Sequence, residues 1–178
     1  CLDGRVKTLH PIIHGGLLGR TSHQPDVDEM NRLDINPIDL VVVNLYPFEK
    51  TVAKPDCTPA IATENIDIGG PTMLRAAAKN FAHVCVLTSP QQYTEFENKL
   101  EQQGEISFKI RQIWAKEAFN HTAHYDANIA NYFNNLDNNE EQLPQQLNIS
   151  LRKSQSLRYG ENPHQKAAVY GQQSDYID

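Results

Sequence analysis

No stretch of this sequence is apolar over the roughly 20 residues that a membrane-spanning helix needs, and no hydrophobic secretory segment opens the chain. Cysteine is scarce as well. Cys1, Cys57 and Cys85 have neither the CxxC spacing of a zinc site nor the number that a disulfide framework needs. We therefore expect a soluble, cytoplasmic protein with reduced thiols and no membrane partner. Cys85 lies in an apolar stretch, where a thiol is normally unreactive.

Positive charge is also in deficit, because 16 Lys and Arg residues face 22 Asp and Glu residues and leave a net charge of −6. This balance argues against a broad nucleic-acid surface but allows a local basic pocket for a small molecule. A chain of 178 residues that is 39% hydrophobic can form one main core with some attached material. Because the sequence starts at Cys1, within a loop of functional character, we expect it to be a piece of a longer protein.

Two short apolar stretches predict the strands of a parallel sheet. Residues 38–45, IDLVVVNL, form a continuous β-branched run typical of strands buried on both faces, and residues 83–88, HVCVLT, form a second run. Helices are predicted over 59–65, from 71 onward and over 90–104, where proline follows a capping residue or glycine ends the pattern. The alternation predicts an α/β fold with helices flanking a parallel sheet, and ligands bound outside the carboxyl ends of the strands.

The segment from Gly4 to Gly19 is rich in glycine and histidine and predicts an ordered loop, with regular structure starting only near Ile38. Ser107 begins the longest predicted helix, whose apolar and aromatic residues recur at helical spacing and form a stripe that we expect to be mostly core. The stripe comprises Ile110, Trp114, Ala118, His121, Tyr125, Ile129 and Phe133.

A second unit is predicted near the end of the sequence. Residues 137–146 are rich in Asn, Glu and Gln and form the best candidate for a linker. Residues 147–159 then predict a further strand, followed by a polar segment with a Gly-Glu-Asn-Pro turn. We therefore divide the chain into a main unit, residues 1–150, and the beginning of a second unit, residues 151–178.

The first candidate site is the loop before the first predicted strand. Arg5 offers a planar fork of donors, Lys7 a point charge and Thr8 a hydroxyl, a combination that suits a phosphate or another oxyanion. A solvated basic turn is the alternative interpretation. Asn44 and Tyr46 end the first predicted strand, a position that often lines α/β sites, although a tyrosine there can also be a packed residue at the edge of the core.

The second candidate site is the stretch DIGGPTMLRAAAKN, residues 67–80. Asp67 precedes a helix whose first N–H groups and positive dipole end favour an anion. Arg75 and Lys79 are four residues apart, where like charges repel unless a negative group lies nearby. A carboxylate and a lysine that converge can divide proton removal and proton donation between them. The alternative is a capping aspartate with solvated cations on a surface helix.

Two histidine pairs raise the question of a metal. His10 and His14 are spaced HxxxH but lie on either side of Pro11 in the predicted loop, and His121 and His124 are spaced HxxH. Neither pair has the glutamate of the HExxH motif that makes such spacing specific for zinc. We therefore expect no metal site.

Five long strings, all in one order, resemble a known family: LDGRVKTLHP, HGGLLGR, VVVNLYPFEKTV, IDIGGPTMLRAAAKN and LRYGENPHQ. They are similar to the bifunctional purine-biosynthesis enzymes with AICAR transformylase and IMP cyclohydrolase activities, and the similarity runs from Leu2 to Ala168. The resemblance implies a methylglyoxal-synthase-like parallel α/β fold whose amino-terminal part is missing here. Residues 1–150 then form the later part of the cyclohydrolase domain, and residues 151–178 the beginning of the transformylase domain.

The resemblance also implies the residues of the site. The implied catalytic group consists of Lys7, Tyr46, Asp67 and Lys79. The implied substrate-binding residues are Arg5, Thr8, Asn44, Gly69 and Gly70 in the cyclohydrolase, and Arg158 and Tyr159 at the AICAR site of the transformylase. In this scheme Asp67 assists deprotonation of an amide, while Lys7 and Lys79 stabilise the developing oxyanion.

The implied reaction is the ring closure of formyl-AICAR to IMP with loss of water, without a metal or redox cofactor. The transformylase of the family formylates AICAR with 10-formyltetrahydrofolate as co-substrate, and the family is homodimeric. Because the phosphate-binding loops of the cyclohydrolase lie outside this sequence, we expect the isolated chain to be inactive. Two other interpretations stay open: a phosphate-binding lyase of the methylglyoxal-synthase type, and a non-catalytic piece that only associates with the rest of the enzyme.

Overall fold

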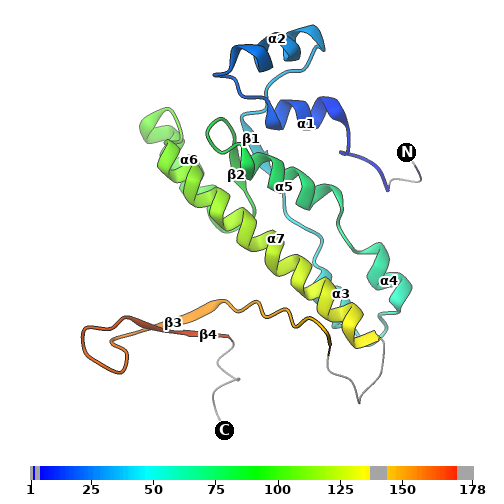
Figure 1. Ribbon diagram of the computed structural model, residues 1–178, viewed down its shortest axis with the longest axis vertical. Coiled ribbons are helices and arrows are strands. Elements are labelled where there is room, and N and C mark those ends of the chain that lie inside the picture. The colour runs from blue at the N-terminus through cyan, green and yellow to red at the C-terminus, as the bar shows by residue number, and fades with distance from the viewer. Residues whose placement is uncertain (1, 3–4, 137–143, 172–178) are drawn as a thin grey trace.

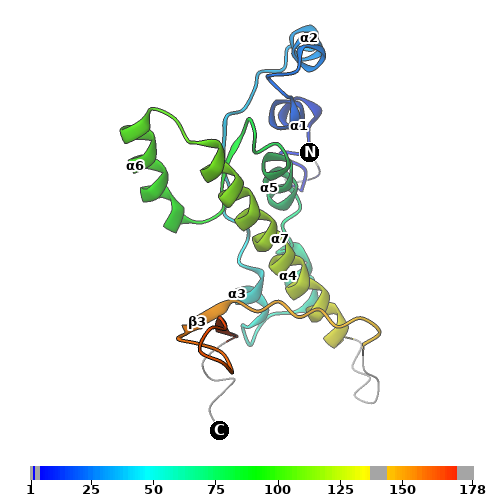
Figure 2. The ribbon, with the colours of Figure 1, turned by 60° about the vertical axis from the view of Figure 1, so that its left-hand side comes forward.

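The computed structural model describes residues 2, 5–136 and 144–171. A long helix, α7 (Phe108–Leu136), crosses most of the molecule, and α5 (Gly69–Lys79) packs beside it (Figure 1). Residues 11–32 and residues 153–170 lie at opposite ends of the molecule in both views (Figures 1 and 2).

A two-stranded parallel sheet lies next to these helices and confirms the predicted α/β class. β1 (Leu40–Val42) pairs with β2 (Cys85–Leu87), and Val41 lies opposite Val86. Both strands are shorter than the predicted stretches 38–45 and 83–88. All of β2 is buried, but in β1 only the central residue is buried, so the expectation that 38–45 is covered on both faces is wrong. Successive side chains of a strand point to opposite faces, and only one face of β1 meets α5.

The main core forms where α5, α7 and the sheet meet. Its buried residues are Leu17, Val41, Leu74, Ala76, Ala77, Ala78, Val84, Val86, Ala115 and Ala118. Alanine on both helices allows their backbones to approach closely, and Leu74 fills the space between them with no exposed surface. No helix in the described part of the chain is long and apolar enough to cross a membrane.

The helix predicted over 90–104 is confirmed. It consists of a short 3-10 turn (Pro90–Gln92) followed by α6 (Tyr93–Gln103). Gln92 and Ser89 form a capping box at its start, and Gly104 ends it with a φ of 72°, a left-handed conformation that glycine adopts without strain. α7 likewise begins one residue after the predicted Ser107, and its apolar stripe is buried or half-buried except at Phe133, which is 43% exposed.

The prediction of a loop over Gly4–Gly19 is wrong, because α1 (Pro11–Leu18) occupies half of it, and α2 (Gln24–Arg32) follows before the expected start of regular structure. The His10 side chain caps α1 by accepting the N–H of Ile12 at 3.2 Å, and Pro11 holds the first helical position. The glycines that favoured a loop lie inside the helix, at positions where other groups come too close to leave room for a side chain. A Cβ on Gly16 would lie 2.6 Å from the Asn36 carbonyl oxygen.

Two short helices follow β1. α3 (Phe48–Val52) was not predicted, whereas α4 (Pro59–Glu64) lies where the sequence placed a helix. Thr58 caps α4 as expected by accepting the N–H of Ile61 at 3.2 Å. α5 begins at Gly69, two residues before the predicted start at Pro71, which stands third in the helix, where its missing N–H is still not needed.

The last described segment is an antiparallel hairpin of β3 (Lys153–Leu157) and β4 (Ala167–Tyr170). It lies at the end of the molecule opposite α1 and α2 (Figures 1 and 2). The strand is shorter than the predicted 147–159, and every residue of β3 is exposed. Most of the predicted linker, residues 137–143, lies outside the described residues, and the division at residue 150 stays a prediction.

Asn80 joins α1 to α5, so replacing it should cause a measurable loss of stability. Its buried side-chain amide donates hydrogen bonds to the carbonyl oxygens of Leu17, at 3.0 Å, and Gly19, at 2.9 Å. We expect Asn80→Ala to lower the free energy of unfolding by about 1–3 kcal/mol, because two carbonyl groups lose their donor in a buried place. Urea unfolding measures this difference. Asn98→Ala, at an exposed position of α6, is the control, and an equal loss in both variants would contradict the role of Asn80.

The cysteines predict a difference in chemical reactivity. Burial of Cys85 in β2 raises the pKa of its thiol to about 11, whereas Cys57 is only half-buried. Since the thiolate is the reactive form, iodoacetamide at pH 8 should modify Cys57 and leave Cys85 intact in the folded chain. Peptide mapping by mass spectrometry checks this result, and in denaturant both residues should react. Equal labelling of the two cysteines in the folded chain would show that β2 is not covered.

Candidate functional site

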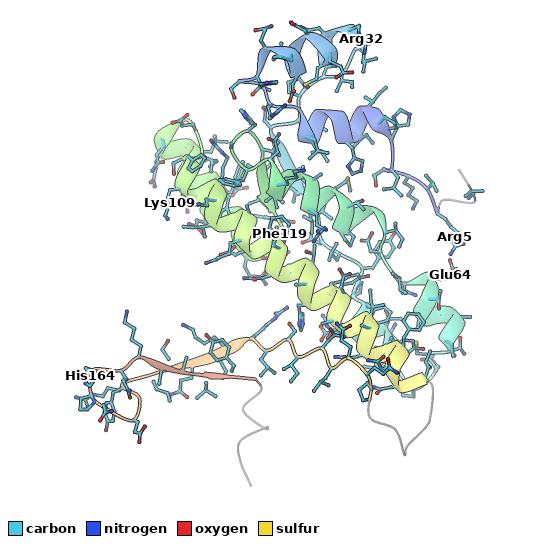
Figure 3. All side chains as sticks on the ribbon, viewed as in Figure 1. Arg5, Arg32, Glu64, Lys109, Phe119 and His164 are labelled. Carbon is cyan, nitrogen blue, oxygen red and sulfur yellow. The ribbon has the colours of Figure 1, made fainter. Side chains whose placement is uncertain are left out.

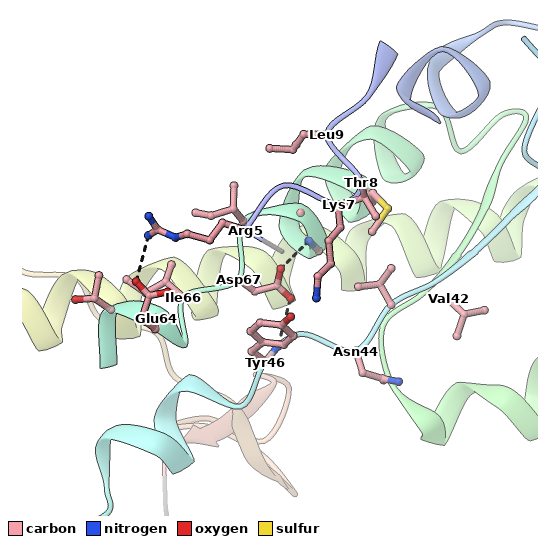
Figure 4. Close-up of a pocket in the computed structure, with 16 residues that line it drawn as sticks. Arg5, Lys7, Thr8, Leu9, Val42, Asn44, Tyr46, Glu64, Ile66 and Asp67 are labelled. Carbon is pink, nitrogen blue, oxygen red and sulfur yellow. Dashed lines mark hydrogen bonds and ion pairs between the residues drawn. The ribbon is translucent and has the colours of Figure 1, made fainter. Parts of the chain in front are cut away.

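A cavity with a volume of about 620 Å³ opens beside the carboxyl end of β1. Figure 4 shows the loop of residues 5–9, the end of β1 and the start of α5 around it. The lining residues are Arg5, Lys7, Thr8, Leu9, Val42, Val43, Asn44, Tyr46, Thr63, Glu64, Ile66, Asp67, Ile68, Gly69, Gly70 and Met73. The site therefore lies where the strand-and-helix pattern predicted it, outside the carboxyl end of a parallel strand.

Asp67 stands in the turn between α4 and α5 and is held by both of its carboxylate oxygens. Oδ1 accepts the backbone N–H of Gly70 at 2.8 Å, and Oδ2 accepts the backbone N–H of Tyr46 at 3.4 Å (Figure 4). The carboxylate thus caps the start of α5 and ties it to the segment after β1. Asp67 is only partly buried, so it can also meet a ligand in the cavity.

The two glycines at the start of α5 allow a close approach to the cavity. A Cβ on Gly70 would lie 2.5 Å from Oδ2 of Asp67 and 2.8 Å from Cδ2 of Leu45. A Cβ on Gly69 would collide with the hydroxyl of Thr8. Glycine at both positions therefore lets the side chains of Asp67, Leu45 and Thr8 pack directly against the backbone of the first turn.

Two cations from the loop of residues 5–9 reach this place. Lys7 points into the same space as Asp67 and Tyr46 in Figure 4. Arg5 forms an ion pair with Glu64 at 3.3 Å across the edge of the cavity (Figures 3 and 4). Both side chains of this pair are more than 60% exposed, at 68% and 62%. Such a pair contributes roughly 0–1 kcal/mol, so an anionic ligand can replace Glu64 at little cost.

Two side chains at the end of β1 complete the cavity wall. The Asn44 amide donates a hydrogen bond to the Tyr93 hydroxyl at 2.9 Å, which fixes its orientation toward α6. Tyr46 is 48% exposed and therefore belongs to the site and not to the edge of the core. Its phenol is free to donate a hydrogen bond to a ligand.

The expected convergence of four catalytic side chains is met only for Lys7, Tyr46 and Asp67. Lys79 is exposed at the last position of α5 and does not line the cavity. Arg75 lies over the ring of Phe119 on α7, with its Cζ 5.6 Å from the ring centroid. An aromatic face, and not an anion, is thus the partner found for Arg75, and the spacing of the two cations says nothing about the site.

The other predicted site residues also divide into those that line the cavity and those that do not. Arg5, Thr8, Asn44, Gly69 and Gly70 all line the cavity. Arg158 and Tyr159 lie just after β3, in the hairpin, and do not line it. The structure brings the two loop cations and the α5 turn together although they are far apart in sequence.

Three residues that contact site residues were not predicted from the sequence as part of the site. Glu64 pairs with Arg5, Tyr93 holds Asn44, and Tyr125 contacts the backbone of Asp67. Tyr125 was expected only as part of the apolar stripe of α7. Helical spacing predicts which ring is buried but not which group its hydroxyl meets, so no signal in the sequence marked it.

The donors of the cavity suit an anionic ligand with a proton to exchange. Two cations and a hydroxyl can bind a phosphate or an oxyanion, while a carboxylate beside an ammonium can remove and return a proton. Within the described residues, no three His, Cys, Asp or Glu side chains gather where they could hold a metal ion.

Known proteins are similar to this chain in sequence and in fold. A model of the AICARFT/IMPCHase bienzyme family matches residues 77–177. The bifunctional purine biosynthesis protein PurH of Rippkaea orientalis is 58% identical over 171 residues, which are 95% of this chain and 33% of that protein. PurH of Bacillus cereus (strain AH187) is 53% identical over 169 residues, with the same coverage of 95% and 33%.

The solved crystal structure of ForH is similar at 40% sequence identity with a TM-score of 0.67, and the match covers 75% of this chain and 68% of that chain. At that identity the likeness supports the observed α/β fold independently of the sequence pattern. The chain spans about a third of the length of the curated relatives it matches, since the share of each is 33%.

The glycine contacts predict unequal effects of two similar substitutions. We expect Gly70→Ala to lower the free energy of unfolding by about 1–3 kcal/mol, because the new Cβ meets both the Asp67 carboxylate and the half-buried side chain of Leu45. Gly69→Ala should cost less, and Thr8→Ala should cancel its cost, because Thr8 alone is in the way. Urea unfolding of the three variants and the Gly69→Ala/Thr8→Ala double variant measures this pattern. Equal costs at Gly69 and Gly70 would contradict it.

Proposed function

This chain belongs to the AICARFT/IMPCHase bienzyme family, and we propose that the cavity at the start of α5 is its IMP cyclohydrolase site. The observation that carries the proposal is the meeting of Lys7, Tyr46 and Asp67 in one cavity of about 620 Å³, a volume that suits a small-molecule ligand. The substrate is formyl-AICAR and the product is IMP. The names of the PurH relatives as bifunctional purine biosynthesis proteins support this choice.

In the proposed reaction the carboxamide nitrogen of formyl-AICAR attacks the formyl carbon and forms the new C–N bond of the ring. Asp67 accepts the proton that the amide nitrogen loses, either directly or through water. The formyl oxygen gains negative charge, which Lys7 stabilises and then protonates, and Tyr46 adds a hydrogen bond. The hydroxyl then leaves as water with the proton that Asp67 accepted, and the former formamide nitrogen gives its proton back to Lys7 as the C=N bond of IMP forms.

Part of the contacts to the substrate phosphate is proposed to come from the loop of residues 5–9 and the first turn of α5, in addition to the phosphate-binding loops that the resemblance places outside this sequence. Arg5 and Thr8 donate to its oxygens, with Arg5 leaving Glu64 for the ligand. Gly69 and Gly70 are proposed to bring the backbone of α5 close to the substrate, and Asn44 helps to orient the base. The ring closure proposed here uses no metal or redox cofactor.

The rest of the family's activity is proposed for the longer protein. Residues 1–150 are then part of the cyclohydrolase domain and residues 151–178 the beginning of the transformylase domain, where Arg158 and Tyr159 contact AICAR and 10-formyltetrahydrofolate donates the formyl group. We propose a cytoplasmic homodimer. Because the chain spans 33% of its relatives' length, we expect the isolated chain to be inactive in both reactions.

Two substitutions test the proposed roles in a protein of the relatives' full length that carries this chain. Asp67→Asn should lower kcat for formyl-AICAR cyclisation by about a hundredfold or more, because the amide proton loses its acceptor, and Lys7→Ala should lower it similarly. The formation of IMP, followed by ultraviolet absorbance, measures the rate. Lys50→Ala, at an exposed position of α3 outside the cavity, is the control for Lys7→Ala. An unchanged rate in Asp67→Asn would contradict the proposal that Asp67 accepts the amide proton.

Lys79 requires a separate measurement because it does not line the cavity. A loss of rate in Lys79→Ala comparable to that of Asp67→Asn would mean that this lysine contacts the substrate in the assembled protein, for example in the site of a second subunit. An unchanged rate would remove Lys79 from the catalytic group and leave the assignment to Lys7, Tyr46 and Asp67.

A further inference from the structure

Tyr125 of α7 forms hydrogen bonds with the turn between α4 and α5. The backbone N–H of Asp67 donates a hydrogen bond to the phenol oxygen of Tyr125 at 2.8 Å. The same hydroxyl donates to the carbonyl oxygen of Asn65 at 3.4 Å. One oxygen atom therefore bridges the two sides of the turn that carries Asp67, although Tyr125 is 58 positions away from Asp67 in the sequence.

The Tyr125 ring has little freedom to move. It is 7% exposed and lies edge-on to Phe48, with ring centroids 6.3 Å apart and an angle of 69° between the planes. Phe48 and Ala62 are the other buried members of this cluster, so the ring touches both α3 and α4. Because a packed ring fixes its own hydroxyl, the oxygen that meets the Asp67 backbone is fixed as well.

The surroundings of the hydroxyl keep it in its neutral form. Burial raises the pKa of Tyr125 above the usual value near 10, and the nearby Asp67 carboxylate adds to this effect. The neutral phenol can accept the Asp67 N–H and still donate to Asn65, whereas a phenolate has no proton for the second bond. The bridge is thus complete at neutral pH.

We infer that Tyr125 is a positioning residue that holds Asp67 in the geometry needed for proton transfer, an inference that rests on the proposed function. Tyr125 does not line the cavity and so does not touch the substrate. The N–H of Gly70 holds the carboxylate of Asp67 from within the same turn, and the N–H of Tyr46 holds it from the segment after β1 through a longer bond of 3.4 Å. The Tyr125 hydroxyl adds hydrogen bonds between the turn and the long helix at the backbone of Asp67 itself, next to the apolar packing of Ile66 in the same cluster.

The size of the expected effect follows from the geometry of catalysis. A reacting group that shifts by about 1 Å can lose roughly a hundredfold in rate, even when the change that moves it lies away from the reaction. Tyr125→Phe keeps the ring and its contact with Phe48 but removes the bridging oxygen. The variant should therefore fold and bind substrate, but should place Asp67 less accurately.

The test compares four variants of the full-length protein in the cyclisation assay: Tyr125→Phe, Tyr132→Phe, Asp67→Asn and the Tyr125→Phe/Asp67→Asn double variant. Tyr132→Phe is the matched control, because Tyr132 also packs edge-on to Phe48, at 5.6 Å, but its hydroxyl has no hydrogen-bond partner among the described residues. We expect Tyr125→Phe to lower kcat about tenfold or more with KM changed less than about twofold, and Tyr132→Phe to change neither. In the double variant Tyr125→Phe should add no further loss, because it acts through Asp67.

Hydrogen exchange of the peptide that covers residues 65–70, measured by mass spectrometry, gives a readout apart from activity. Exchange there should be faster in Tyr125→Phe than in Tyr132→Phe. An unchanged kcat in Tyr125→Phe together with a loss in Asp67→Asn would overturn the inference and leave the proposed function intact. A full rate in Asp67→Asn would overturn both. Additive losses in the double variant, or unchanged exchange at 65–70, would reduce Tyr125 to a merely structural residue and also overturn the inference.

Discussion

The close packing of α5 against its neighbours is the constraint on which the rest of this structure depends. The helix contacts α1 on one side and α7 on another, and it also covers both strands of the sheet. Ala77 and Ala78 leave almost no exposed surface, and Asn80 at its end carries the hydrogen bonds that hold α1. A larger side chain on this face would separate the helix from α7, because packed cores have little spare volume.

The same helix gives the candidate site its chemistry at the opposite end. Glycines in its first turn let the side chains of Thr8 and Asp67 pack directly against it, and its capping group is the carboxylate to which we assign the proton transfer. Asp67 therefore has a structural and a chemical role at once. This double use explains why the site is rigid without being buried: the backbone around the carboxylate is tied to the segment after β1 and to α7, while the carboxylate itself still faces the cavity.

Local signals in the sequence predicted much of the fold and failed where distant contacts decide. Thr58, Ser89 and Gly104 marked helix ends correctly because capping depends on residues close in sequence. The helix at Pro11–Leu18 was missed because Gly15 and Gly16 favour loops locally, whereas here they make room for Ile35 and the backbone of Asn36. The site was predicted in large part, since Lys7, Tyr46 and Asp67 meet, but α5 carries Lys79 to its far end, and no local pattern distinguishes these outcomes.

The sequence by itself determined the alternation of strands and helices, the parallel pairing class and, through long strings of specific residues, the family. These follow from periodicity, capping and identity, which are read along the chain. Only the tertiary structure decided which cations face the cavity, that Arg75 rests on Phe119, and that the hydroxyl of Tyr125 meets the backbone of Asp67. The reason is physical: the direction of a side chain depends on how whole helices pack. That packing brings together residues far apart in the sequence, whereas local propensity depends only on neighbouring residues.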